Sequence, residues 1–115
     1  MAQKGERMLG KTITVIVDRP MGACHPVYRD MIYPINYGYI AGVLAPDGEE
    51  QDAYILGVDE PVGEFTGVVI AIIHRLNDVE DKLVVAPSGT EFSLEEIIAQ
   101  TAFQEKYFET TVEIL

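Results

Sequence analysis

The sequence predicts a mainly β fold, a small closed or nearly closed barrel with a C-terminal helix, and three observations support this prediction. Short apolar runs rich in β-branched residues recur up to residue 87, separated by turns that contain proline and glycine. The apolar residues change to helical spacing from about residue 94. Strands and helices do not alternate, which argues against a doubly wound parallel sheet.

Five segments carry the strand signal. Residues 11–18 alternate between two faces and are rich in Val, Ile and Thr. Two prolines and a glycine predict a loop over about 19–29. Pro34 makes the aromatic segment that follows an edge or irregular strand rather than a central one. The expected strands are residues 11–18, 31–40, 53–57, 67–75 and 82–87.

The C-terminal part has a helix signal. Ser93 and Glu96 form a capping-box pattern, and the helix is expected over about residues 94–109. Phe103 and Tyr107 fall opposite its main stripe, so either they pack against a second surface or one of them faces a site. The main stripe consists of Leu94, Ile97, Ile98, Thr101, Ala102, Glu105 and Phe108.

Length and composition indicate one globular domain over residues 1–115, with 48% hydrophobic and 23% charged residues. Cys24 is the only cysteine, so an intrachain disulfide is not available and a reducing compartment suits the chain. The first residues lack the apolar stretch of a signal peptide. The longest apolar run, residues 68–73, is far shorter than the roughly 20 residues of a membrane-spanning helix. We therefore expect a cytoplasmic protein.

The chain is acidic, with 19 acidic and 8 basic residues and a formal net charge of −11. A field of this sign repels nucleic acid and anionic membranes, so neither is expected as a partner. Two explanations of the excess stay open. It serves solubility, or it concentrates acidic groups that hold divalent cations and thereby bring an anionic substrate to an acidic protein.

The segment DGEEQD places Asp47, Glu49 and Asp52 around one turn. Mg²⁺ prefers oxygen ligands, commonly one or two carboxylates completed by water and substrate phosphate. A turn can direct at least two of these carboxylates at one point, so the segment predicts a hard-metal site. A solvated acidic turn is the alternative.

A second acidic turn contains Asp78, Glu80 and Asp81 and is followed at once by Lys82. If the two turns meet at one end of the barrel, they could hold two or more cations that activate water and stabilise charge on a phosphoryl group. Lys82 would then contact phosphate. Otherwise it is a surface lysine that neutralises its acidic neighbours.

Tyr33, Tyr37 and Tyr39 would share one strand face if the register is unbroken. Their hydroxyls can donate to phosphate oxygens, and core packing is the alternative. His25 and His74 are too isolated for a His-rich metal site and are expected to be structural. No GxSxG, P-loop or GxGxxG pattern is present, so nucleophilic hydrolases and nucleotide-binding folds have no support in the sequence.

Three segments in this order resemble motifs of the soluble family I inorganic pyrophosphatases: YPINYGYI at 33–40, DGEEQDAYILG at 47–57 and EDKLVVAP at 80–87. VDRP at 17–20 and FQEKYF at 103–108 resemble two further family segments, so the chain looks like a short and divergent member. The resemblance implies an OB-like five-stranded barrel. It also implies Mg²⁺-dependent hydrolysis of pyrophosphate to two phosphates by a metal-activated water, with Mn²⁺ as an alternative cation.

The resemblance also implies roles for the positions that match the family's motifs. It implies metal ligands at Asp47, Asp52, Glu80 and Asp78, with Asn77 as the alternative to Asp78. It implies catalytic roles for Glu49, which would accept a proton from the attacking water, and for Tyr37 and Lys82. The expected substrate-binding residues are Tyr107 and Asp18, which match motif positions, and Arg29, a nearby candidate for a family cation.

The chain also departs from the family's pattern. The segment between VDRP and YPINYGYI is short, and only His25 and Arg29 are near the family's lysine and arginine there. Phe108 stands where the family has a lysine after the helical tyrosine, and Glu49 and Glu80 each replace an aspartate. Two alternatives therefore stay open: a metal- and phosphate-binding module with little turnover, or a hydrolase of another phosphoanhydride. A homo-oligomer also stays open.

Overall fold

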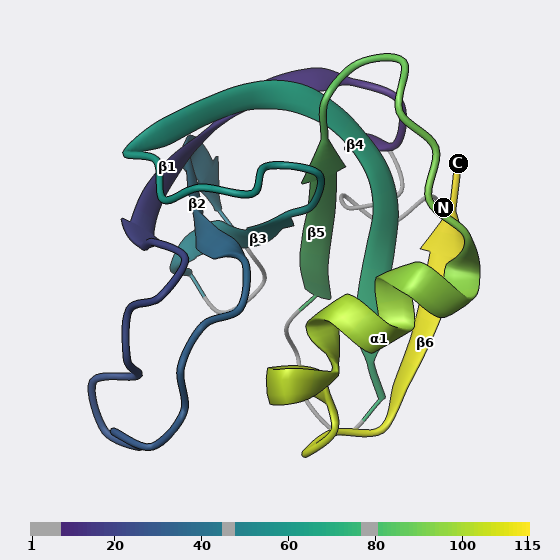
Figure 1. Ribbon diagram of the computed structural model, residues 1–115. Helices are drawn as coiled ribbons and strands as arrows, with labels where there is room; N and C mark the ends of the chain where they lie inside the picture. The colour runs from purple at the N-terminus through teal and green to yellow at the C-terminus, as the bar shows by residue number, and fades with distance from the viewer. Residues whose placement is uncertain (1–7, 45–47, 77–80) are drawn as a thin grey trace.

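The computed structural model describes residues 8–44, 48–76 and 81–115, and these ranges contain six strands and one helix (Figure 1). The elements are β1 (Thr12–Arg19), β2 (Asn36–Leu44), β3 (Glu50–Ile55), β4 (Glu64–Arg75), β5 (Asp81–Ala86), α1 (Leu94–Glu105) and β6 (Thr110–Ile114). Among the described residues, no helix has the length and apolar character needed to cross a membrane.

The long strand β4 closes the barrel. Neighbouring strands follow the order β1-β2-β3-β5-β4, and β1 pairs with β4 as well as with β2. β1 pairs with Glu64–Val68 of β4, and β6 pairs with Ala71–Arg75 farther along. All of these pairings are antiparallel except β3 with β5, which run parallel. The predicted five-stranded barrel with a helix at its side is confirmed.

β3 and β5 have buried residues on both faces, because one face packs into the barrel interior and the other into a second cluster that includes Ile97 of α1. Figure 1 shows α1 beside β4, β5 and β6. The interior cluster contains Val15, Ile40, Ala53, Ile55, Val69, Ile72, Leu83 and Val85. The cluster under the helix contains Tyr33, Ile35, Tyr37, Tyr54, Leu56, Ala71, Ile73, Val84 and Ile97. Three tyrosines therefore pack in the layer between barrel and helix.

The C-terminal part differs from the sequence prediction. The helix ends at Glu105 rather than near residue 109, and residues 110–114 form β6, which the sequence analysis missed. β-branched residues favour this strand, and its partner β4 lies far away in the sequence. On the predicted stripe Ile97, Thr101 and Glu105 are buried, whereas Leu94 and Ile98 are exposed. The buried face of the helix is thus narrower than the predicted stripe.

β2 begins at Asn36, after Pro34, so Tyr33 precedes the strand instead of extending it. The fully buried Asn36 side chain donates to the Glu60 carbonyl and accepts from the Met21 amide, which joins two loops at this end of the barrel. Gly38 lies where β1 and β2 approach most closely. A Cβ there would stand 1.9 Å from the Ile16 carbonyl oxygen, so the position excludes any side chain.

Candidate active site

Lys82 lies at the centre of the candidate site. Its Nζ donates to Asp52 Oδ2 at 2.5 Å and to the Tyr37 hydroxyl at 3.0 Å. Lys82 is 3% exposed, so its interpretation as a surface lysine is wrong. The Asp52 side chain keeps 32% of its surface exposed, which leaves the carboxylate accessible from solvent.

The sheet register explains this grouping. The parallel pair Ala53–Leu83 sets the preceding residues, Asp52 and Lys82, side by side on β3 and β5. Tyr37 lies opposite Tyr54 on the antiparallel β2–β3 pair, so its ring sits on the adjoining strand. Three segments far apart in the sequence thus place a carboxylate, an ammonium group and a phenol within hydrogen-bond distance.

Burial dominates the electrostatics of Tyr37. Burial raises its pKa well above the usual value, Lys82 lowers it, and Asp52 raises it again. The hydroxyl therefore stays protonated at neutral pH. It accepts a hydrogen bond from Lys82, and its own O–H is directed at the Asp52 carboxylate, a hydrogen bond through which Asp52 raises its pKa.

The C-terminal end of β1 lies on the same side of the barrel. Arg19 is opposite Tyr37 in the β1–β2 register, and a bulge between Val17 and Arg19 contains Asp18. Burial raises the pKa of Tyr33, whose ring centroid lies 5.6 Å from that of Tyr37, while Arg19 lowers this pKa and Asp18 raises it. Arg19 and Asp18 thus act on the hydroxyl region of the tyrosine layer.

Arg19 was not singled out from the sequence. Its Nη1 is 3.7 Å from Asp18 Oδ2, and both side chains are partly exposed, 33% and 47%, so this ion pair is weak. The signal that could have found it is its place beside Asp18 at the end of the first strand. Arg29, the cation chosen instead, lies in the exposed loop between β1 and β2.

Of the predicted metal ligands, Asp52 lies within the described residues. Asp47, Asp78, Glu80 and the alternative Asn77 lie outside the described residues. Within the described ranges, no three His, Cys, Asp or Glu side chains gather in a metal-binding geometry. Asp52 is a partly exposed carboxylate, which fits one ligand of a hard cation, and Glu49 is exposed just before β3.

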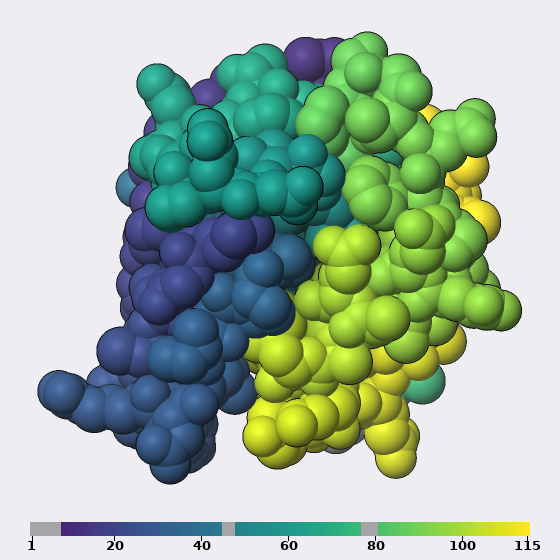
Figure 2. Space-filling model, in the orientation of Figure 1, coloured from purple at the N-terminus to yellow at the C-terminus, as the bar shows by residue number. Residues whose placement is uncertain are grey.

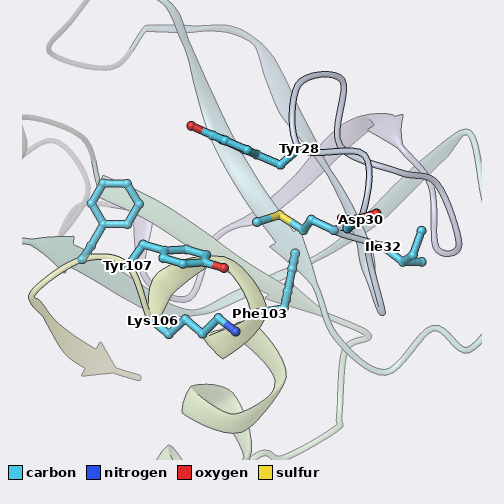
Figure 3. A pocket seen from close by; sticks show the side chains of 8 residues that line it. Tyr28, Asp30, Ile32, Phe103, Lys106 and Tyr107 are labelled. Carbon is cyan, nitrogen blue, oxygen red and sulfur yellow. The ribbon is translucent and has the colours of Figure 1, made fainter.

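Tyr107 lies elsewhere, in a cleft of ≈ 700 Å³ between the loop before β2 and the end of the helix. Tyr107 and Tyr28 occupy opposite sides of this space in Figure 3, and Figure 2 shows the hollow between the two segments. Asp52 and Lys82 do not line it. The cleft is lined by Tyr28, Asp30, Met31, Ile32, Phe103, Lys106, Tyr107 and Phe108.

Aromatic rings in edge-to-face and tilted contact lie between this cleft and Lys82. Phe103, at the cleft, lies 5.3 Å from the Tyr33 ring, and Tyr33 lies 5.6 Å from Tyr37, measured between ring centroids. Phe103 therefore packs into the aromatic layer. Packing against a second surface was one of the two alternatives that the sequence left open for Phe103 and Tyr107. Tyr107 is 65% exposed and is not part of the buried layer.

Both histidines make structural contacts. His25 Nδ1 accepts from the backbone amides of Val27 and Tyr28 and so shapes the loop. His74 lies between Asp81, 3.1 Å from Nδ1, and Glu113, 2.8 Å from Nε2, and joins β4, β5 and β6. Asp81 of the second acidic turn is thus paired with a histidine.

The structure contains a buried ion pair, Arg75–Glu105, that the sequence analysis did not predict. Arg75 Nε donates to Glu105 Oε1 at 3.0 Å and Arg75 Nη2 donates to Oε2 at 2.7 Å, and the two side chains are 5% and 6% exposed. The position of Glu105 on the apolar stripe of the helix was the available signal, because a buried carboxylate requires a partner.

Comparisons with known proteins agree with this architecture. No family model matches the chain. The inorganic pyrophosphatase of Aeropyrum pernix is 36% identical over 56 residues, a match that spans 49% of this chain and only 31% of that relative. The solved inorganic pyrophosphatase of Ehrlichia chaffeensis superposes with a TM-score of 0.72 at 18% identity, covering 92% of this chain and 87% of that one.

A second solved structure, the inorganic pyrophosphatase of Coxiella burnetii, has a TM-score of 0.65 at 19% identity and covers 92% of this chain and 86% of its own. At 18% and 19% identity these two structures show a common fold and no more. The short sequence match is to a protein that is also named an inorganic pyrophosphatase. The chain therefore has the fold of the inorganic pyrophosphatases, the family that its motifs resemble.

Proposed function

We propose that the protein hydrolyses inorganic pyrophosphate to two phosphates with Mg²⁺, or alternatively Mn²⁺, as cofactor. The observation that carries this proposal is the buried Lys82, held between Asp52 and the Tyr37 hydroxyl on three neighbouring strands. An ammonium group, a carboxylate and a protonated phenol at one point are suited to phosphoryl oxygens and a hard cation. The names of the similar proteins support the same substrate.

Each residue would act through its own chemistry. Lys82 would provide positive charge to a phosphoryl oxygen, and Tyr37 would donate its O–H to another. Asp52 would be one ligand of the cation, with Asp47, Asp78 and Glu80 as the other proposed ligands, and Glu49 would accept the proton of the attacking water. When bound, Mg²⁺ would neutralise substrate charge and lower the pKa of a water molecule.

Charge makes the cations necessary. Pyrophosphate is a multiply charged anion and the chain carries a net charge of −11, so unassisted binding would be opposed by repulsion. Lys82 supplies one positive charge in the site, and we propose that Arg19, on β1 opposite Tyr37, supplies a second. Asp18, Tyr107 and Arg29 remain substrate-binding proposals that come from the motif resemblance.

The remaining expectations belong to the same proposal. We propose a single domain that acts in the cytoplasm on a small anion rather than on nucleic acid or at a membrane, with a homo-oligomer left open. One observation favours a binding module with little turnover as the second candidate: the Lys82 ammonium group is already engaged by Asp52 and Tyr37.

Phosphate release from pyrophosphate tests the proposal. The purified protein is assayed with Mg²⁺ and with Mn²⁺, beside a panel of nucleotides and the Asp52→Asn variant. We expect Mg²⁺-dependent release that is greatest with pyrophosphate and is lost in Asp52→Asn. Absence of turnover together with calorimetric binding of Mn²⁺ and phosphate would select the binding module, and faster release from a nucleotide would select another phosphoanhydride.

A further inference from the structure

The Arg75–Glu105 pair joins the end of β4 to the end of α1. Both side chains are almost fully buried, and the contact is bidentate. A buried ion pair is weak support for stability, because apolar residues of similar volume often serve equally well at such a place. A role other than stability is therefore open to this pair.

One side of the pair leads toward Lys82. Glu105 Oε2 accepts from the Tyr54 hydroxyl at 2.5 Å, and Tyr54 has no exposed surface. The Tyr54 ring centroid lies 5.0 Å from that of Tyr37, whose hydroxyl accepts from Lys82. The Glu105 carboxylate, together with Gln104 Nε2, which donates to the same hydroxyl at 2.8 Å, thus holds the ring against which Tyr37 packs.

The other side of the pair leads toward Tyr107. The Arg75 guanidinium lies over the Phe108 ring, with Cζ 3.6 Å from the ring centroid, which is close enough for a cation–π contact. Phe108 follows Tyr107 in the turn after the helix. Its backbone amide donates to the Glu105 backbone carbonyl at 2.9 Å, independently of the Glu105 side chain, so the pair contacts the turn that carries Tyr107 through Arg75 and the Phe108 ring.

We propose that Arg75 and Glu105 are positioning residues, which fix Tyr37 and Tyr107 relative to one another without contacting substrate. The catalytic consequence rests on the proposed pyrophosphatase function, whereas the positional one does not. Removal of the pair should rotate the Tyr54 ring, loosen the turn at Phe108 and displace both tyrosines. A displacement of this kind commonly costs about 10²-fold in rate.

The test has a readout that is independent of turnover. The full chain is labelled with 3-fluorotyrosine, and the resonances of its six tyrosines are assigned by Tyr→Phe variants. The double variant Arg75→Met/Glu105→Leu removes both charges of the pair together, so neither member is left without the other. Thr101→Val is the matched control, since Thr101 is buried on the same helix face and its hydroxyl donates to the Ile97 and Ile98 carbonyls of its own helix.

We expect the ¹⁹F resonances of Tyr37, Tyr54 and Tyr107 to shift in the double variant and to stay in place in Thr101→Val. With pyrophosphate as substrate, kcat/KM should fall by about 10- to 100-fold, through both kcat and KM, at temperatures where the variant is fully folded. Arg75→Lys, which retains the charge but not the bidentate contact, should recover part of both effects and serves if the double variant does not fold.

Three outcomes separate this inference from the proposed function. Unmoved Tyr37 and Tyr107 resonances in the folded variants would overturn the positioning role, whatever the wild-type activity. Shifted resonances with unchanged kcat and KM would leave the pair purely structural and also overturn it. If the resonances shift in the double variant but the wild-type protein does not turn over pyrophosphate, the positional coupling is supported and only the proposed function is contradicted.

Discussion

Replacing Lys82 with methionine removes the ammonium group that joins Asp52 to Tyr37 while keeping most of the buried side-chain volume. Among the described residues, the lysine donates to a carboxylate and to a phenol. The two partners will respond differently. Asp52 is 32% exposed on its side chain and can recover water, whereas Tyr37 is 9% exposed and loses a buried partner.

These differences set the expected magnitude. Loss of a partner by a buried polar group costs about 1–3 kcal/mol, and rehydration of Asp52 keeps the total near the middle of this range, about 2 kcal/mol. The effect on catalysis is larger, because removal of one preorganised donor to a transition-state oxyanion typically lowers kcat by about 10²- to 10³-fold. Lys82→Met should therefore be folded but almost inactive.

Two assays on one preparation check this prediction. Urea unfolding gives the change in the free energy of unfolding, and phosphate release from pyrophosphate gives kcat and KM. Lys11→Met is the matched control, because Lys11 is exposed and precedes β1. A folded Lys82→Met protein with the kcat/KM of wild type would refute the assignment of Lys82 to the substrate.

Three further predictions concern other parts of the molecule. Arg19→Met should raise KM for pyrophosphate by about 10-fold with little effect on kcat, and a larger rise in Arg29→Met would show that the exposed-loop arginine is the one that binds. Burial lowers the pKa of His74, but Glu113 and Asp81 outweigh it and the folded pKa lies above 6.5. His74 should therefore stabilise the fold fully below pH 6.5 and lose this contribution as pH rises through the folded pKa. The melting temperature of wild type should exceed that of His74→Gln at acidic pH, and this difference should disappear above the folded pKa. Ser93→Ala should cost about 1 kcal/mol in urea unfolding, because Ser93 Oγ accepts from the Glu96 amide; equal stability of the two proteins would contradict the cap.

The barrel could be predicted because local signals agree with it. Strand residues alternate, turns contain proline and glycine, and the capping box at Ser93 and Glu96 begins the helix as expected. β6 could not be predicted in the same way. Helical spacing continues through Phe108, and the five-residue strand depends on pairing with β4, a long-range contact that leaves no local pattern.

The site was predictable in residue type but not in geometry. The motif segments led to Tyr37, Asp52 and Lys82, which the fold brings together through the parallel β3–β5 register. Burial of Lys82 could not be predicted, because the acidic residues that precede it are typical of an exposed turn. Arg75 lacked a signal of its own, because its need for a partner arises only when α1 packs against β4 and brings Glu105 to it.

Mg²⁺-dependent release of phosphate from pyrophosphate by the purified chain, beside Asp52→Asn at the same concentration, tests the central claim most directly. The account predicts two phosphates released per pyrophosphate consumed, dependence on Mg²⁺ or Mn²⁺, and loss of about 10²-fold or more in Asp52→Asn. A folded wild-type protein that releases no phosphate with either cation, or one whose activity Asp52→Asn leaves unchanged, would contradict it.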